Sequence, residues 1–168
     1  IYPTGFINTQ NLYSGLLFFV ILVKLKINNI IKFVMKKIKK FKIKSFSKSS
    51  GKIITMGFDN KFPINVKRIF FLYDKKGKNR GDHAHKKCSQ FFYPVLGKFL
   101  IKVQTHKKVE KILLNHDAKI GLLIPPKYWV SVKFLSKNSS LMVVCDQLYN
   151  ENDYIHNFNE YINLLRNK

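Results

Sequence analysis

Two histidines, His83 and His85, stand two residues apart in the segment 80–90, which reads RGDHAHKKCSQ. On a β-strand, side chains at positions i and i+2 point to the same face. If that face lines a cavity, the two imidazoles can bind a metal ion or move protons near neutral pH. Arg80 adds a guanidinium three residues before His83. A surface pair on a loop is the alternative that this spacing leaves open.

The residues around this segment follow the pattern of β-strands. Short runs of Ile, Val, Phe and Leu, separated by Gly, Pro, Asn and Ser, predict strands at 41–47, 52–57, 66–73, 90–96, 98–104, 109–114, 120–124, 129–135 and 140–147. Strands at this spacing without intervening helices favour a sandwich or barrel. The interior of such a barrel is the cavity into which the two histidines would point.

One helix is predicted at the C-terminus. Its apolar residues recur at helical spacing: Tyr154, Ile155, Phe158, Ile162 and Leu165. Asn152 and Asp153 precede this set where a helix cap is expected. We interpret this helix as packing against the barrel.

The composition is that of one globular domain. The chain has 168 residues, of which 46% are hydrophobic, enough to bury a substantial core. Its 31 Lys and Arg against 9 Asp and Glu give a net charge of +22, which suggests nucleic-acid binding as a first hypothesis. We do not expect such binding, because nearly all the basic residues are lysines, and abundant Lys, Asn, Ile and Phe are typical of an A+T-rich genome.

The two cysteines, Cys88 and Cys145, form no disulfide framework. Both lie in apolar runs, and neither has a CxxC partner. We expect reduced, buried thiols of a cytoplasmic protein and no zinc site of the cysteine type.

Residues 1–34 differ from the rest of the chain. Their apolar run, 16–23, is too short to span a membrane, and no basic residues precede it as they would in a signal peptide. Met35 then opens MKKIKKFKIKSF, which is typical of a bacterial start. We expect residues 1–34 to be an N-terminal extension, upstream or non-native in origin, and 35–168 to be the functional domain. A membrane-associating extension is the alternative.

The histidine pair also stands in a longer frame. Gly77, His83, His85, Gln90 and Gly97 have the spacing of the first cupin motif, and the segment therefore resembles the cupins, which are jelly-roll (double-stranded β-helix) barrels. Metal-binding cupins carry glutamate at the position of Gln90 and a further histidine after a proline-rich turn. Here that turn, 124–130, reads IPPKYWV. Because glutamine is a poor metal ligand, we expect no catalytic metal and no cofactor.

Four segments in order give a closer resemblance. The segments are KRIFFLY (67–73), RGDHAHKK (80–87), GLLIPP (121–126) with Trp129 downstream, and the C-terminal run 149–161. They resemble the sugar 3,4-ketoisomerases of the WxcM-like cupin family. The resemblance implies a metal-free, cytoplasmic homodimer. Its substrate would be dTDP-4-keto-6-deoxyglucose, converted to a 3-keto sugar on the way to 3-amino sugars of surface glycans such as lipopolysaccharide.

The resemblance also implies roles for individual residues. His83 and His85 become the proton-handling pair, and Arg80 becomes the substrate or oxyanion contact. Substrate-binding candidates are Tyr73, Gln90, Trp129 and Lys86. If the family's tyrosine aligns with Phe71 instead, one hydrogen-bond donor is missing. Packing remains the alternative for Trp129, and a core amide for Gln90.

Two other functions remain open at this point. The glutamine at position 90 leaves room for a non-catalytic cupin that binds a sugar nucleotide, and a metal cupin is a third reading. Under each sugar-nucleotide hypothesis, the lysine-rich surface would attract an anionic nucleotide diphosphate. Neither nucleic acid nor a membrane is an expected partner.

Overall fold

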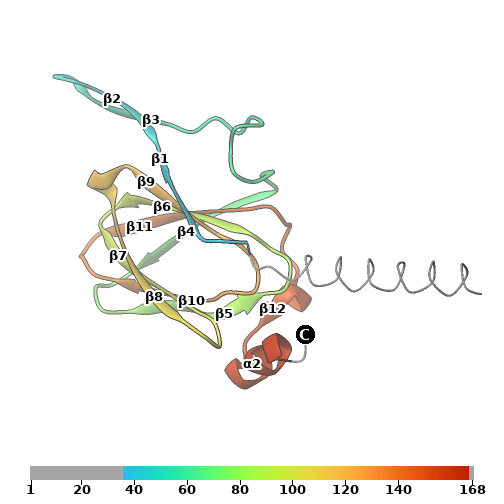
Figure 1. Ribbon diagram of the computed structural model, residues 1–168. Coiled ribbons are helices and arrows are strands. Elements are labelled where there is room, and N and C mark those ends of the chain that lie inside the picture. The colour runs from blue at the N-terminus through green and yellow to red at the C-terminus, as the bar shows by residue number, and fades with distance from the viewer. Residues whose placement is uncertain (1–35, 167–168) are drawn as a thin grey trace, which may run out of the picture. The chain divides into compact units, whose positions relative to one another are not determined.

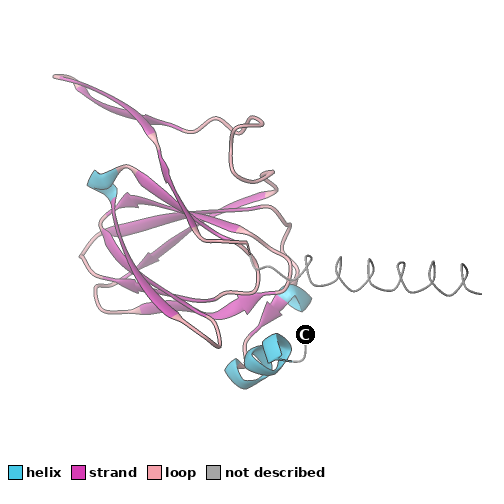
Figure 2. Ribbon diagram, in the orientation of Figure 1, coloured by secondary structure: helices cyan, strands magenta, loops and turns pink. Residues whose placement is uncertain are grey.

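The computed structural model describes residues 36–166, so the predicted extension 1–34 lies outside the described residues. Two five-stranded antiparallel sheets face each other (Figures 1 and 2). The first has the order β1-β9-β6-β11-β4: Lys39–Lys42, Ile120–Ile124, Gln90–Leu96, Ser139–Cys145 and Arg68–Asp74. The second has the order β12-β5-β10-β7-β8: Tyr154–Ile155, Asn79–His85, Trp129–Phe134, Lys98–Gln104 and Val109–Asn115.

The core lies between these two sheets because their strands alternate apolar and polar side chains. Phe99 and Phe134 from one sheet and Leu122 and Leu141 from the other are fully buried in a single cluster. Burying such side chains contributes roughly 1.5–3 kcal/mol each. The all-β sandwich or barrel predicted from the strand spacing is confirmed, as is the jelly-roll barrel implied by the cupin resemblance.

The C-terminal helix, α2, runs from Phe158 to Arg166. Asn157 caps it by accepting hydrogen bonds from the backbone N–H groups of Asn159 and Glu160. Tyr161 and Leu165 pack against the barrel, as predicted. The helix begins later than predicted, because Tyr154 and Ile155 pair with His85 and Ala84 as the short strand β12.

A separate hairpin, β2–β3, joins Lys44–Lys48 to Gly51–Thr55 and projects away from the barrel (Figure 1). It makes its own two-stranded sheet. Short 3₁₀ turns lie at His116–Ala118 and Glu151–Asp153. Within residues 36–166, no helix is long and apolar enough to cross a membrane.

Candidate active site

A cavity of about 130 Å³ opens between the two sheets. Its walls are mostly apolar, and its polar side chains come from His83, Gln90 and Tyr154. Phe70 and Leu72 line it from β4, because alternate residues of this strand face inward. The cavity is therefore suited to a ligand with an apolar surface and a few polar groups.

The strand that carries the histidines, β5, contains a bulge. Val130 of β10 pairs with His83 and Ser131 pairs with Gly81, so Asp82 is the extra residue of the bulge. Gly81 has φ +88°, and a Cβ atom there would lie 2.8 Å from the carbonyl oxygen of Val130. Glycine is therefore required at this position, and the bulge sets the direction of His83 just after it.

The two imidazoles lie together, as their spacing predicts. Their ring centroids are 5.1 Å apart, with planes at 82°. His83 lines the cavity, whereas His85 lies behind it and is 4% exposed. The ring of Tyr154 packs against both, at 5.0 Å from His83 and 4.3 Å from His85. This arrangement excludes the surface-loop alternative for the pair.

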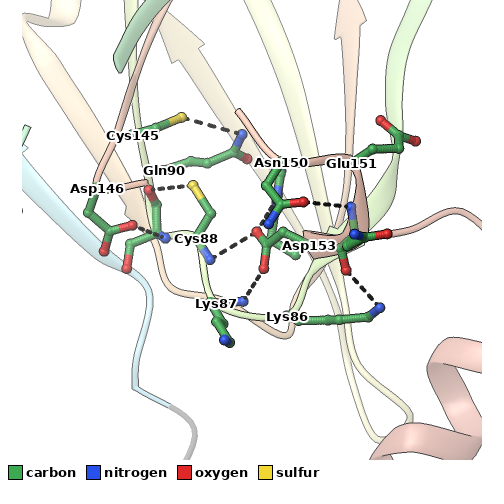
Figure 3. A network of polar contacts seen from close by, with 12 residues as sticks. Lys86, Lys87, Cys88, Gln90, Cys145, Asp146, Asn150, Glu151 and Asp153 are labelled. Carbon is green, nitrogen blue, oxygen red and sulfur yellow. Dashed lines mark hydrogen bonds and ion pairs between the residues drawn. The ribbon is translucent and has the colours of Figure 1, made fainter. Parts of the chain in front are cut away.

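Asp153 fixes the orientation of His85. Its Oδ2 atom lies 2.9 Å from Nδ1 of His85, and the side chains of His85 and Asp153 are 5% and 11% exposed. The same carboxylate accepts backbone hydrogen bonds from Lys87 (2.7 Å) and Cys88 (3.2 Å), which hold it in place (Figure 3). A carboxylate partner puts the imidazole proton on Nδ1. Nε2 of His85 then keeps its lone pair, and it has no hydrogen-bond partner among the described residues.

Burial keeps both rings neutral at neutral pH. Desolvation, followed by the charges of His85 and His156, lowers the pKa of His83 to about 4. Desolvation also lowers the pKa of His85, against the opposing effect of Asp153. A neutral imidazole can accept a proton, which is what a general base must do.

The guanidinium beside the histidines belongs to Arg68, and the prediction of Arg80 at this place is wrong. Arg80 is exposed, and its Nε donates to Asp74 at 2.7 Å, at the opposite end of β4 from Arg68. Arg68 donates to Sγ of Cys145 (3.6 Å) and interacts with Tyr154. Its charge adds to the lowering of the pKa of His85. Its Nε atom is buried without a partner in the described structure.

Of the predicted substrate-binding residues, some line the cavity and others lie away from it. Gln90 lines the cavity as predicted, with its amide 4.0 Å from Sγ of Cys145. Tyr73 is 65% exposed, because odd-numbered residues of β4 face outward, and its predicted place in the cavity is wrong. Trp129 packs between Phe158 and Tyr161 rather than lining the cavity, which fits the packing alternative. Lys86 is exposed and donates to the carbonyl of Asn152.

Three residues of this site were not predicted from the sequence: Asp153, Tyr154 and Arg68. Asp153 and Tyr154 were assigned to the cap and first turn of a helix. Arg68 lies in one of the segments that carry the family resemblance, and Asp153 and Tyr154 lie in another. Membership of these segments is the signal that could have identified the three residues. Among the described residues that line the cavity, Tyr154 alone carries a hydroxyl group.

Together these groups suit proton transfer at a carbon atom next to a carbonyl group. His83 and the carboxylate-held His85 supply proton acceptors, and the hydroxyl of Tyr154 beside Arg68 can stabilise an oxyanion. The apolar walls strengthen each electrostatic interaction by excluding water.

Comparisons with known proteins agree with this chemistry. Residues 36–166 match the family model FdtA, described as WxcM-like, C-terminal. A TDP-4-oxo-6-deoxy-alpha-D-glucose-3,4-oxoisomerase from Aneurinibacillus thermoaerophilus is 30% identical over 118 residues, covering 68% of this chain and 84% of that protein.

Solved structures of ketoisomerases have the same fold. A 3,4-ketoisomerase from Helicobacter canadensis superposes with a TM-score of 0.72 at 28% identity, covering 77% of this chain and 98% of that one. The 3,4-ketoisomerase QdtA from Thermoanaerobacterium thermosaccharolyticum has a TM-score of 0.74 at 25% identity, covering 80% and 98%. That structure is a histidine-to-asparagine variant in complex with TDP-4-keto-6-deoxyglucose.

Proposed function

The chain belongs to the WxcM-like, C-terminal (FdtA) family, and from this we propose that it is a 3,4-ketoisomerase of dTDP-4-keto-6-deoxyglucose. It is an isomerase, as are the relatives to which it is similar. The observation that carries the proposal is the pair of neutral imidazoles at the cavity, one lining it and the other held by the carboxylate of Asp153.

The proposed reaction moves a carbonyl group without a redox cofactor. The hydrogen on C3 is weakly acidic because it lies next to the C4 carbonyl. Its removal gives an enediol or enediolate, and return of a proton to C4 leaves the carbonyl at C3. Both steps need a proton carrier and a donor for the oxygen that becomes negative, which general acid–base and electrostatic catalysis provide.

We assign the proton transfer to the histidine pair. His83 lines the cavity and exchanges the proton with the sugar. His85, oriented by Asp153, lies against His83 and supplies the second proton-accepting nitrogen. General acid–base groups of this kind contribute roughly 10²–10⁴-fold each to the rate.

We assign the stabilisation of the enediolate oxygen to Tyr154, supported by Arg68. The Tyr154 ring lines the cavity next to both imidazoles. Arg68 interacts with Tyr154. Its guanidinium carbon also lies over the rings of Phe70 and Tyr149, 5.3 and 5.4 Å from their centroids. This pair takes the role that the sequence analysis gave to Arg80.

The product assay tests this function. Purified protein given dTDP-4-keto-6-deoxyglucose should form a 3-keto sugar nucleotide, which a coupled 3-aminotransferase traps as the amino sugar. His83→Asn and His85→Asn should each lower the turnover by orders of magnitude while the circular dichroism spectrum stays unchanged. Full turnover in both variants would reject the assignment. The non-catalytic alternative is not favoured, because the relatives named above are isomerases.

We also propose a homodimer, as expected from the family resemblance. The edge strand β4 exposes Ile69, Phe71 and Tyr73 on one face, and the hairpin β2–β3 exposes Phe46 and Ile53. Exposed apolar patches and unpaired strand edges are the features that mark association surfaces. Sedimentation equilibrium should give twice the chain mass. Phe71→Ser should shift the species toward monomer, whereas Leu113→Ser, at an exposed apolar site on β8, should not.

We also propose three further properties. The functional domain spans residues 35–168, the enzyme works in the cytoplasm, and its product leads to 3-amino sugars of surface glycans. N-terminal sequencing of the native protein tests the first, because peptides from before Met35 would contradict an upstream origin of residues 1–34.

A further inference from the structure

A second cluster of chemically reactive side chains lies around His85, next to the proposed proton-transfer site. It comprises His85, Cys88 and Asp153, whose ligand atoms all lie within 4.8 Å of one another. His85 and Cys88 are 4% and 2% exposed, and the side chain of Asp153 is 11% exposed. A nitrogen, a sulfur and an oxygen donor thus meet in one buried place, although the sequence spacing of the cysteines gave no sign of it.

The cluster is held in place by the surrounding backbone. The N–H groups of Lys87 and Cys88 donate to Asp153 (Figure 3). The Oδ2 atom of Asp153 also lies 2.9 Å from Nδ1 of His85. His85 ends β5, and Cys88 lies three residues later in the turn before β6. The donors therefore need little rearrangement to converge on one ion, which is the main requirement for a tight site.

We propose that this cluster binds a thiophilic divalent cation of the zinc type and that the bound ion inhibits the enzyme. Zinc prefers thiolate, imidazole and carboxylate donors at bond lengths of about 2.0–2.3 Å, which places the donors of a tetrahedral site roughly 3.3–3.8 Å apart. Three donors within 4.8 Å reach this spacing by small side-chain movements. Three protein ligands leave a fourth position for water.

This site differs from the metal site considered in the sequence analysis. That site would have used His83, His85 and residue 90 inside the barrel. The proposed ion lies instead at Nδ1 of His85, and it takes neither His83 nor Gln90 as a ligand. The glutamine at position 90, which argues against a metal in the barrel cavity, therefore has no bearing on it.

The inhibition follows from the tautomer of His85. Without the ion, Nδ1 carries the proton shared with Asp153, and Nε2 keeps a lone pair. The ion requires the lone pair at Nδ1, so the proton moves to Nε2 and the ring can no longer accept another there. The thiol of Cys88 loses its proton to solvent as it becomes a thiolate ligand. Binding thus releases one proton and removes one proton acceptor.

Cobalt binding tests the site without reference to catalysis. Chelator-treated protein is titrated with Co²⁺ alone, and one equivalent per chain should produce a thiolate-to-cobalt charge-transfer band. Cys88→Ser should abolish the band and weaken binding at least ~100-fold, since losing even an outer-shell partner of a metal ligand costs 10–100-fold. Cys145→Ser is the control for the neighbouring thiol, because Cys145 is buried and hydrogen-bonds to Cys88 but is not one of the three donors. Cys145→Ser should keep the band.

A second measurement covers the case in which Cys88→Ser does not fold. X-ray absorption at the zinc edge of the wild-type protein should show one sulfur in the first shell with nitrogen and oxygen. A shell without sulfur would overturn the site, as would a missing charge-transfer band or a band that persists in Cys88→Ser.

The inhibition rests on the proposed isomerase function, and the two can fail separately. Zn²⁺ should abolish turnover of the wild type, a chelator should restore it, and Cys88→Ser should resist Zn²⁺ relative to its own metal-free rate. Co²⁺ binding in a protein without turnover would reject the isomerase and keep the site. Turnover without any Co²⁺ band would reject the site and keep the isomerase.

Discussion

Nδ1 of His85 lies 2.9 Å from Oδ2 of Asp153, although 68 residues separate the two in the sequence. The short strand β12 brings them together, because Tyr154, next to Asp153, pairs with His85 at the end of β5. The carboxylate sets the tautomer of the imidazole and would stabilise the imidazolium during turnover. This contact makes the C-terminal segment a part of the proposed catalytic apparatus.

Replacing the carboxylate tests that contact. Asp153→Asn keeps the size of the side chain but removes the charge and can turn the imidazole to the other tautomer. We expect kcat to fall by about 10²–10⁴-fold, the range for a general acid–base group, with a smaller change in KM. Steady-state kinetics measures both. An unchanged kcat in a folded Asp153→Asn protein would show that Asp153 has no part in proton transfer.

Removing one hydroxyl tests the oxyanion donor. Tyr154→Phe keeps the ring that packs on both histidines and removes the hydroxyl beside Arg68. Loss of one oxyanion donor costs about 10²–10³-fold in kcat in other enzymes, and we expect a loss of this size. Tyr149→Phe is the matched control, because Tyr149 is exposed and bonds to Glu151. Equal effects of the two substitutions on kcat would contradict the assignment.

The roles of Arg68 and Arg80 can be distinguished by replacing each with lysine. Arg68→Lys keeps a positive charge but changes the planar donor group that interacts with Tyr154 and Cys145. We expect it to lower kcat at least ~10-fold, since lysine cannot reproduce a guanidinium's fixed donors. Arg80→Lys should have little effect on kcat, because Arg80 pairs with Asp74 away from the cavity lining. A larger loss of kcat in Arg80→Lys than in Arg68→Lys would contradict this assignment and return the role to Arg80.

Two glycines with nearly the same φ angle test whether the close approach of the backbone at the β5 bulge requires glycine. Gly81 and Gly77 have φ +88° and +89°, but a Cβ would collide with the carbonyl of Val130 only at Gly81. Gly77→Ala should cost about 1–2 kcal/mol of unfolding free energy from the backbone angle. Gly81→Ala should cost about 1–3 kcal/mol more from overpacking. Chemical denaturation measures the difference, and equal costs would mean that the close approach in β5 does not constrain position 81.

Much of the barrel could be predicted from the sequence, because most of its strands are apolar runs bounded by turn residues. The strands at 90–96, 98–104 and 120–124 have the predicted limits. Strand β5 was not among the predicted runs, since its residues, NRGDHAH, contain almost no apolar side chains. Its partners β10 and β12 determine its conformation, and no local pattern shows this pairing.

The site was predictable where its residues are local and not where distant segments meet. His83, His85 and Gln90 lie within eight positions, so strand alternation predicts all three at the cavity. His83 and Gln90 line it, whereas His85 lies just behind it. Tyr73 and Phe70 lie on opposite faces of one strand, and the sequence did not fix which face is inward. Asp153, Tyr154 and Arg68 reach the histidines through the tertiary fold alone. Arg80 is near the histidines in sequence, but its side chain pairs with Asp74 instead.

Exchange of the C3 hydrogen with solvent tests the central claim most directly. The chelator-treated protein is incubated with dTDP-4-keto-6-deoxyglucose in heavy water, and NMR spectroscopy and mass spectrometry locate the deuterium in the recovered sugar nucleotide. The account predicts deuterium at carbon in the wild type and a loss of at least ~100-fold in its rate of incorporation in His83→Asn. Tight binding of the sugar nucleotide with no deuterium at C3 or C4 would contradict proton transfer by these histidines.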